Sequence, residues 1–274
     1  MIKILIYGEK GYIGSLLKEY LLKESNIQIL SSLFPKIKDE QQIEKDIEIL
    51  KPNRIISCIG LTNTKTDNST LFLNKDSYLP KNLENNLYIH ILLANVCINN
   101  NIHFTYIGTG CIYNSFDSNF IFSENAKPNY IDNNYGLVKG YTDKILSLNQ
   151  NKILILRLRQ CINNDLHSRN FLNKFLKLKK VSILPNSFTI VPSIFPIIIK
   201  LILDRIVGIY NAVNKNSISV KEIVDIYEKS DYEIADSKFI QKKYANNILS
   251  TKKLEEKFIV EDVKSAIIKM KNKT

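Results

Sequence analysis

The chain has 274 residues, 45% of them hydrophobic and 24% charged, which is enough to bury the core of one large domain or of a domain with a smaller lobe. Nine glycines and seven prolines are too few for a fibrous, linker-rich or compositionally disordered protein. Lysine and arginine total 38 against 27 acidic residues, a formal net charge of +11. A polyanion-binding face and compositional drift both explain that charge. The lysines are scattered, which favours drift and no nucleic-acid partner.

Signals of secretion, membrane insertion and structural metal are absent from the sequence. The apolar run at the N-terminus is too short for a signal peptide. The most apolar stretch, 188–203, is interrupted by prolines and a lysine and is shorter than a membrane span, so it predicts a buried strand and helix. The four cysteines form no CxxC pair and accompany no histidine cluster. We therefore expect a cytoplasmic protein with no metal and no membrane partner.

Strand and helix patterns alternate over the first 160 residues. Residues 2–7 predict a strand buried on both faces, followed by a glycine loop and an amphipathic helix that extends to residue 22. The patterns that follow predict strands at 27–30, 54–58, 103–107 and 152–157 and helices at 41–50, 83–97 and 135–148. Because parallel strands need crossover helices, this order predicts an α/β fold with a doubly wound parallel sheet of the Rossmann type.

The alternation loosens after residue 160. The patterns there predict helices at 170–179, 193–205, 219–227 and 260–271 and a strand at 208–212. We expect a Rossmann domain over residues 1–160 and a small C-terminal lobe over 161–274, with some of its chain returning to the sheet.

Three glycines lie between the first predicted strand and the first predicted helix. The GxxGxxG spacing of Gly8, Gly11 and Gly14 is typical of loops that turn tightly and bring the backbone close to a pyrophosphate at a helix N-terminus. Tight packing of the helix on the strand is the alternative explanation. We expect this domain to bind a dinucleotide.

The residues after the second predicted strand bear on which dinucleotide is bound. An acid there would hold the ribose 2′-hydroxyl of NAD, but the chain has Ser31 and Ser32. Lys10 in the loop and Lys36 downstream are candidates to face a 2′-phosphate. The sequence therefore favours NADP(H), with NAD(H) as the alternative.

A second motif places Tyr135 and Lys139 four residues apart, on one face of a predicted helix. A nearby ammonium stabilises a phenolate, so the tyrosine can exchange a proton with a carbonyl or an alcohol during hydride transfer. Thr109, at the end of the preceding strand, is placed to hydrogen-bond the same oxygen. A surface pair of side chains is the alternative, and the preceding glycine motif favours the catalytic interpretation.

Three segments carry a resemblance to a known family: GEKGYIG at Gly8, IGTGCIY at 107–113 and YGLVK at Tyr135. They resemble the extended short-chain dehydrogenase/reductases. The whole chain is similar to their dTDP-4-dehydrorhamnose reductase-like branch and, within it, to the UDP-4-keto-6-deoxyglucose 3,5-epimerase/4-reductases of UDP-rhamnose synthesis. Further stretches support the narrower resemblance: ILRLR at 155–159, SRNFLNK at 168–174, PNSFTI at 185–190, GIYNAVN at 208–214 and NNILSTKKLEEKF at 246–258.

The resemblance implies a bifunctional nucleotide-sugar enzyme that converts UDP-4-keto-6-deoxy-D-glucose to UDP-L-rhamnose with NADPH. It implies that Cys111 and Lys174 exchange protons at C3 and C5. From position alone, Cys111 would be interpreted as a small buried residue at a strand end, and the alternative for Lys174 is the solvated face of a lysine-rich helix. His167 is the competing acid, because histidine has the better-placed pKa.

The resemblance also implies the residues that hold each ligand. For the coenzyme they are Gly8, Lys10, Gly11, Tyr12, Ile13, Gly14, Gly60, Asn86, Tyr135 and Lys139. For the nucleotide sugar they are Thr62, Thr109, Gln160, Asn170, Lys174 and Asn186. Two segments beside the expected sugar pocket, 63–68 and 160–161, depart from the Gly-Arg-Pro and Met-Pro of the plant-like enzymes.

Two other functions stay open at this point. One is a plain dTDP- or UDP-4-dehydrorhamnose reductase without epimerase activity. The other is a non-catalytic NADP-binding subunit, because the regulatory subunit of methionine adenosyltransferase resembles the same branch. The resemblance also allows a homodimer, since relatives often pair through the helix that carries the residues equivalent to Tyr135 and Lys139.

Overall fold

The computed structural model describes residues 1–64, 69–238, 240 and 246–273. The chain forms two compact units, each built from three stretches. Unit 1 comprises residues 1–108, 133–156 and 198–209, and unit 2 comprises 109–132, 157–197 and 210–274. The chain therefore passes between the units several times. We predicted that residues 1–160 bind the coenzyme and residues 161–274 the substrate, and this division of roles stays a prediction.

A six-stranded sheet has the order β2-β1-β3-β4-β6-β8. Strand β1 pairs in parallel with β2 and with β3, and β3 pairs in parallel with β4. The order in which successive strands are added to the sheet therefore reverses between β1 and β3, and open α/β sheets bind their ligands at such a switch point. The predicted doubly wound α/β fold is confirmed. The strands are β1 (Ile2–Tyr7), β2 (Ile27–Leu30), β3 (Arg54–Ser57), β4 (His103–Thr109), β6 (Leu154–Leu158) and β8 (Gly208–Asn211).

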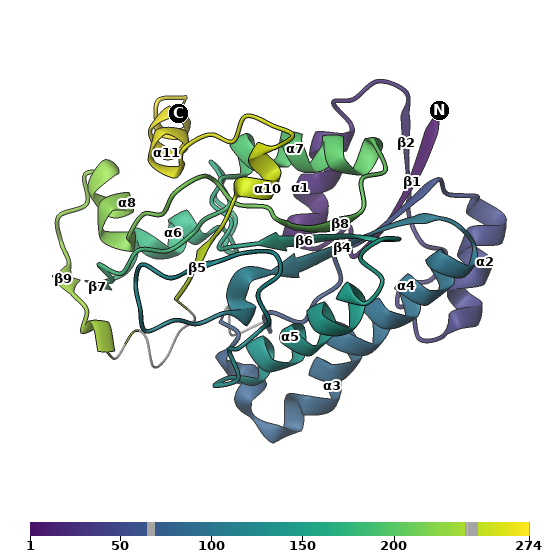
Figure 1. The fold of residues 1–274 in the computed structure, drawn as a ribbon, viewed down its shortest axis with the longest axis horizontal. Coiled ribbons are helices and arrows are strands. Elements are labelled where there is room, and N and C mark those ends of the chain that lie inside the picture. The colour runs from purple at the N-terminus through teal and green to yellow at the C-terminus, as the bar shows by residue number, and fades with distance from the viewer. Residues whose placement is uncertain (65–68, 239, 241–245, 274) are drawn as a thin grey trace. The chain divides into compact units, whose positions relative to one another are not determined.

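Helices connect these strands at the expected places. Helices α4 (Ile89–Asn99) and α5 (Asn134–Ser147) lie side by side along one face of the sheet (Figure 1). Helix α1 (Tyr12–Leu21) follows the glycine loop, and α2 (Glu40–Leu50) begins where the Asp39 side chain accepts a hydrogen bond from the Gln42 N–H. Between β3 and α4 the chain forms short helical turns at Leu71–Asn74 and Asp76–Tyr78, α3 (Leu79–Leu83) and a π-helical turn at Glu84–Tyr88.

The core of unit 1 explains why its strands are so apolar. Ile55 and Ile56 of β3 are fully buried, as are Leu5 of β1 and Phe104 of β4. Strands that bury both faces need apolar residues at consecutive positions, as the sequence predicted. Residues 191–203 of the apolar segment 188–203 form helix α7 (Val191–Leu203), and no helix among the described residues is long and apolar enough to cross a membrane.

Unit 2 has its own core and short elements. Its core includes Phe175, Phe188, Ile190, Ile218 and Val263. Two pairs of short strands come together from distant parts of the chain, β5 with β10 and β7 with β9. The elements are the 3-10 turn Gly110–Ile112, β5 (Ile121–Phe122), α6 (Phe171–Phe175), β7 (Lys180–Val181), α8 (Val220–Ile226), β9 (Glu233–Ile234), β10 (Ile248–Leu249), α10 (Lys252–Glu255) and α11 (Val263–Lys271).

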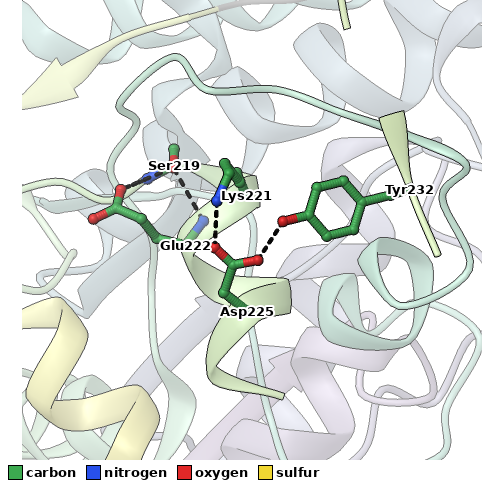
Figure 2. Close-up of polar contacts among 5 residues, drawn as sticks. All are labelled: Ser219, Lys221, Glu222, Asp225 and Tyr232. Carbon is green, nitrogen blue, oxygen red and sulfur yellow. Dashed lines mark hydrogen bonds and ion pairs between the residues drawn. The ribbon is translucent and has the colours of Figure 1, made fainter. Parts of the chain in front are cut away.

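Helix α8 begins with a capping residue, Ser219. The Ser219 hydroxyl accepts a hydrogen bond from the Glu222 N–H, and the Glu222 carboxylate accepts one from the Ser219 N–H (Figure 2). Lys221 pairs with Asp225 at 2.6 Å on the exposed side of the helix, and Tyr232 donates to the same carboxylate. This capping box satisfies backbone groups that a helix start leaves unpaired.

Two predicted helices differ from the structure. The helix predicted over 170–179 ends at Phe175, because the chain then extends to pair Lys180 and Val181 with Glu233 and Ile234. Lys174 therefore lies in a five-residue helix, and the prediction of a longer, lysine-rich helix around it is wrong. The helix predicted over 83–97 instead starts at Leu79, with Pro80 in its first turn.

Candidate active site

The glycine loop of unit 1 is shaped as a cradle. Gly8 has φ +81°, and a Cβ added there would lie 2.8 Å from the backbone of Cys58. A Cβ on Gly14 would lie 2.2 Å from the Gly8 carbonyl oxygen. Helix α1 starts directly after Gly11, which supplies no side-chain cap, so the Tyr12, Ile13 and Gly14 end of the helix is open to an anion. The loop fits the pyrophosphate of a dinucleotide.

Glu9 in this loop is tied to the end of strand β2. Its carboxylate accepts hydrogen bonds from the Ser31 hydroxyl at 2.5 Å and from Lys18 of α1 at 2.8 Å. These two bonds lower the pKa of Glu9 below its ordinary value. No acid follows the second strand in the sequence, but the fold brings the carboxylate of Glu9 there from the loop. The acidic residue directly after Gly8 was the feature of the sequence from which this carboxylate could have been predicted.

Asn86 fixes the segment that follows β3. It is fully buried in the π-helical turn, and its amide both accepts from the Leu61 N–H at 3.1 Å and donates to the Leu61 carbonyl at 3.0 Å. Gly60 approaches the same amide, where an added Cβ would lie 3.4 Å from its oxygen. Thr62 is half-buried just beyond. Asn86 therefore positions the Gly60–Thr62 segment. The next segment, 63–68, is one of the two that differ from the plant-like enzymes, and its residues 65–68 lie outside the described residues.

Tyr135 and Lys139 lie on helix α5, as predicted. The helix begins where the Asn133 side chain accepts from the Gly136 N–H at 2.7 Å. Tyr135 is half-buried, whereas Lys139 is 4% exposed with its Nζ 4.4 Å from the centre of the Tyr106 ring. A buried ammonium over an aromatic face is a stabilised, immobile charge. The two side chains keep the spacing needed for a tyrosine assisted by a lysine.

The Lys139 charge also acts on its buried neighbours. Burial lowers the pKa of His90 well below its ordinary value, and the charge of Lys139 lowers it further. His90 therefore stays neutral, with its Nδ1 3.0 Å from the Ser57 hydroxyl. Burial raises the pKa of the Cys58 thiol to about 12, so this thiol is protonated at neutral pH.

In unit 2, Cys111 lies in a built environment. Thr109 caps the 3-10 turn by accepting from the Cys111 N–H at 3.1 Å. The Arg159 guanidinium donates to the Cys111 sulfur at 2.9 Å and to the Asn186 amide oxygen at 3.0 Å. Arg159 is 2% exposed, so the cation that faces the sulfur is largely shielded from water.

A pair of asparagines holds the backbone around Cys111. The buried Asn247 donates to the carbonyl oxygens of Gly110 and Tyr113, at 3.0 and 2.9 Å. The backbone N–H of Asn247 in turn donates to Asn186 at 3.2 Å. These contacts link segments more than 130 residues apart and fix the turn that carries Cys111. Arg159 and Asn247 were not among the site residues predicted from the sequence, although both lie in segments that carry the family resemblance.

The remaining predicted sugar-binding residues differ in how they are placed. The Asn170 amide is fully buried and bonds to Asn163, Asp165 and Leu172 around its own loop. Lys174 is half-buried, with its Nζ 4.8 Å from the Phe171 ring centre. His167, the competing acid, is exposed and accepts from the Arg169 N–H.

Gln160 has an unusual conformation for a residue with a side chain. Its φ of +37° is in the left-handed region, which costs backbone strain. Its amide oxygen is buried with no hydrogen-bond partner among the described residues. Strain and an unused acceptor are features found at ligand sites. They fit the predicted role of Gln160 in substrate binding, which stays a prediction.

The catalytic residues predicted from the sequence are divided between the two units. Tyr135 and Lys139 belong to unit 1, whereas Thr109, Cys111 and Lys174 belong to unit 2. Within unit 2 the structure joins Thr109 and Cys111 through one hydrogen bond. The catalytic roles of all five stay predictions.

Comparison with known proteins identifies the family. Residues 4–161 match the NAD dependent epimerase/dehydratase family. The chain belongs to this family. It is an extended short-chain dehydrogenase/reductase, a family that uses nicotinamide dinucleotides, in agreement with the fold and the glycine cradle.

Individual relatives extend over the whole chain. The L780 protein of Acanthamoeba polyphaga mimivirus is 31% identical over 98% of this chain and 99% of its own length. The crystal structure of L780, described as a UDP-rhamnose synthase, superposes with a TM-score of 0.92 at 32% identity, covering 100% of this chain and 99% of L780.

Two further relatives are more distant. The trifunctional UDP-glucose 4,6-dehydratase/UDP-4-keto-6-deoxy-D-glucose 3,5-epimerase/UDP-4-keto-L-rhamnose-reductase RHM2 of Arabidopsis thaliana is 28% identical over 94% of this chain, which spans 40% of that enzyme's length. The dTDP-4-dehydrorhamnose reductase of Bacillus anthracis, solved with NADP, shares the fold with a TM-score of 0.79 at 19% identity, covering 100% of both chains.

Proposed function

We propose that this chain is a bifunctional enzyme that converts UDP-4-keto-6-deoxy-D-glucose to UDP-L-rhamnose, acting as a 3,5-epimerase and a 4-keto-reductase. The observation that carries the proposal is its end-to-end similarity to the L780 UDP-rhamnose synthase, at 32% identity and a TM-score of 0.92. The Arabidopsis relative, whose name includes the same epimerase and reductase activities, supports it.

In the proposed epimerisation, the C4 ketone acidifies the protons on C3 and C5, because each carbanion is stabilised as an enolate. Cys111, as a thiolate, removes such a proton from one face, and Lys174 returns a proton from the opposite face, which inverts the carbon. Arg159 supports this role, because a guanidinium stabilises an anionic sulfur. His167 is the alternative acid.

In the proposed reduction, Tyr135 donates a proton to the C4 oxygen. The bound coenzyme supplies the hydride that C4 receives. Lys139 favours the phenolate that remains after proton transfer, and the buried position of Lys139 supports that role. Thr109 hydrogen-bonds the C4 carbonyl and polarises it. The product is the C4 alcohol, and no covalent bond to the protein forms.

The other parts of the proposal come from the sequence. NADP(H) is the proposed coenzyme, held by the glycine loop and by Lys10, Gly60, Asn86, Tyr135 and Lys139, with NAD(H) as the alternative. Thr62, Gln160, Asn170 and Asn186 are proposed to bind the nucleotide sugar. A cytoplasmic enzyme is proposed, with a homodimer as its expected assembly and with neither nucleic acid nor membrane as a partner.

The decisive assay supplies UDP-4-keto-6-deoxy-D-glucose and NADPH in D₂O and follows the product by NMR. The proposal expects UDP-L-rhamnose that carries deuterium at C3 and C5 and hydride-derived hydrogen at C4. Absence of coenzyme oxidation, with NADPH or NADH, would refute the reductase. Reduction without deuterium at C3 and C5 would leave a plain 4-keto-reductase and refute the epimerase.

A further inference from the structure

The side chain of Glu9 occupies a place in unit 1 that the sequence had left without an acid. Ser31 directly follows β2, and the carboxylate of Glu9 reaches the hydroxyl of Ser31 from the glycine loop at 2.5 Å. In dinucleotide-binding sheets, the residue at the end of this strand, about 20 residues beyond the glycine loop, meets the ribose 2′ position of the adenosine. The fold therefore supplies a carboxylate at the position that distinguishes NAD from NADP.

The carboxylate is fixed and charged. Lys18 of α1 holds its second oxygen at 2.8 Å, and the side chain of Glu9 is only 15% exposed. The bonds to Lys18 and Ser31 lower its pKa, so it is ionised at neutral pH. Each carboxylate oxygen has two lone pairs, so acceptor capacity remains after one bond to each. A ribose 2′-hydroxyl is a donor that this group can accept, whereas a 2′-phosphate is an anion that it repels.

The cations predicted to favour a 2′-phosphate are partly engaged elsewhere. Lys36 pairs with Glu84 at 2.7 Å, and Lys18 already neutralises Glu9. Lys10 lies next to Glu9 in the loop, and its charge acts on the Glu9 carboxylate as well. The local charge therefore combines cations that attract a 2′-phosphate with an anion that opposes it.

We propose that Glu9 is the coenzyme-selecting residue of this chain, and that its carboxylate admits NADH beside NADPH by accepting the ribose 2′-hydroxyl and repelling the 2′-phosphate. This rests on the proposed use of a nicotinamide dinucleotide. Glu9 then does from the glycine loop what an acid at the end of β2 does in NAD-selective proteins.

The test is equilibrium binding of NADH and NADPH by calorimetry, with full-length protein and no sugar. In the unsubstituted protein the two dissociation constants should lie within about tenfold of each other. Glu9→Gln keeps an acceptor for Ser31 but removes the charge, and should shift the affinity ratio towards NADPH by about tenfold or more. Lys18→Gln removes the neutralising cation and should shift the ratio the other way.

Glu19→Gln is the matched control. Glu19 lies on the same helix and pairs with Lys23 at 2.9 Å, but it is exposed and, among the residues that the structure describes, makes no hydrogen bond to β2 or Ser31. This variant should leave the ratio unchanged. If Glu9→Gln fails to fold, Ser31→Ala tests the same carboxylate by releasing its anchor, and it should shift the ratio towards NADPH by a smaller factor.

An unchanged ratio in Glu9→Gln, or a shift of the same size in Glu19→Gln, overturns the proposal. Failure to bind either coenzyme also overturns it. The proposed sugar chemistry fails in a different way, because an unreactive enzyme that binds both coenzymes with a Glu9-dependent ratio would keep the coenzyme-selecting role and lose the substrate assignment.

Discussion

Replacing Arg159 by glutamine removes a buried positive charge from Cys111. The guanidinium donates to the cysteine sulfur at 2.9 Å and to Asn186 at 3.0 Å, and it is 2% exposed. Glutamine is too short to make both bonds from the same backbone position. If Cys111 acts as a thiolate base, the substitution removes the cation that stabilises that thiolate.

The size of the effect follows from the contact. A hydrogen bond to a charged group contributes about 1.5–3 kcal/mol. If the bond is made to the thiolate that removes the sugar proton, its loss slows proton exchange by about 10- to 150-fold. Hydride transfer to an already epimerised 4-keto sugar does not use Cys111 and should change less than about threefold.

Two rates separate these effects. Solvent deuterium entering C3 and C5 of the 4-keto sugar, followed by NMR, measures epimerisation, and oxidation of NADPH with UDP-4-keto-L-rhamnose measures reduction. Arg157→Gln is the matched control, because Arg157 is equally buried two residues before Arg159 but donates to the Glu124 carbonyl at 2.9 Å. Arg159→Lys retains the charge and should recover part of the exchange rate.

Normal deuterium exchange in a folded Arg159→Gln protein would refute the reasoning. So would an equal loss of both rates, or the same selective loss of exchange in Arg157→Gln, because either result would mean that the arginine supports the fold rather than the thiol. Urea unfolding of each variant shows whether the fold is intact.

Two further predictions concern unit 1. Gly14→Ala places a Cβ 2.2 Å from the Gly8 oxygen and should cost about 1–3 kcal/mol in urea unfolding and abolish coenzyme binding, whereas Gly11→Ala, at 3.3 Å, should be milder; equal effects would contradict the cradle. Burial lowers the pKa of His103 from 6.5 to about 4. The unfolded chain therefore binds more protons below pH 6.5, and up to about 3 kcal/mol of stability should be lost between pH 6.5 and 4. His103→Gln should flatten that decline, and an unchanged slope would contradict it.

The order of helices and strands in unit 1 could be predicted because each element is determined by residues close to one another in the sequence. Strands β1, β2 and β3 and helices α1, α2 and α5 end within one or two residues of the predicted limits. Their apolar runs and helical spacings follow from burying both faces of a sheet under amphipathic helices. Such patterns depend on neighbours within about four residues, which a sequence displays directly.

Short strands and irregular helices could not be predicted, because distant partners decide them. Residues 121–122 form a strand only through pairing with 248–249, and Lys180 and Val181 leave a helical pattern to pair with 233–234. The π-helical turn at Glu84–Tyr88 surrounds Asn86, whose amide bonds 25 residues back to Leu61. None of these contacts has a local periodicity to reveal it.

The candidate site was predicted in part, and the missed residues show what a sequence can still reveal. The segment ILRLR places Arg157 in strand β6 and Arg159 directly after the last residue of that strand. A buried arginine is costly without partners, so one in an apolar strand and another directly after it require acceptors nearby. Arg157 donates to the Glu124 carbonyl, and Arg159 donates to the sulfur of Cys111. An arginine in so apolar a segment was therefore a signal of a buried polar partner, and for Arg159 that partner is the sulfur of Cys111. A role of Cys111 beyond packing stays a prediction.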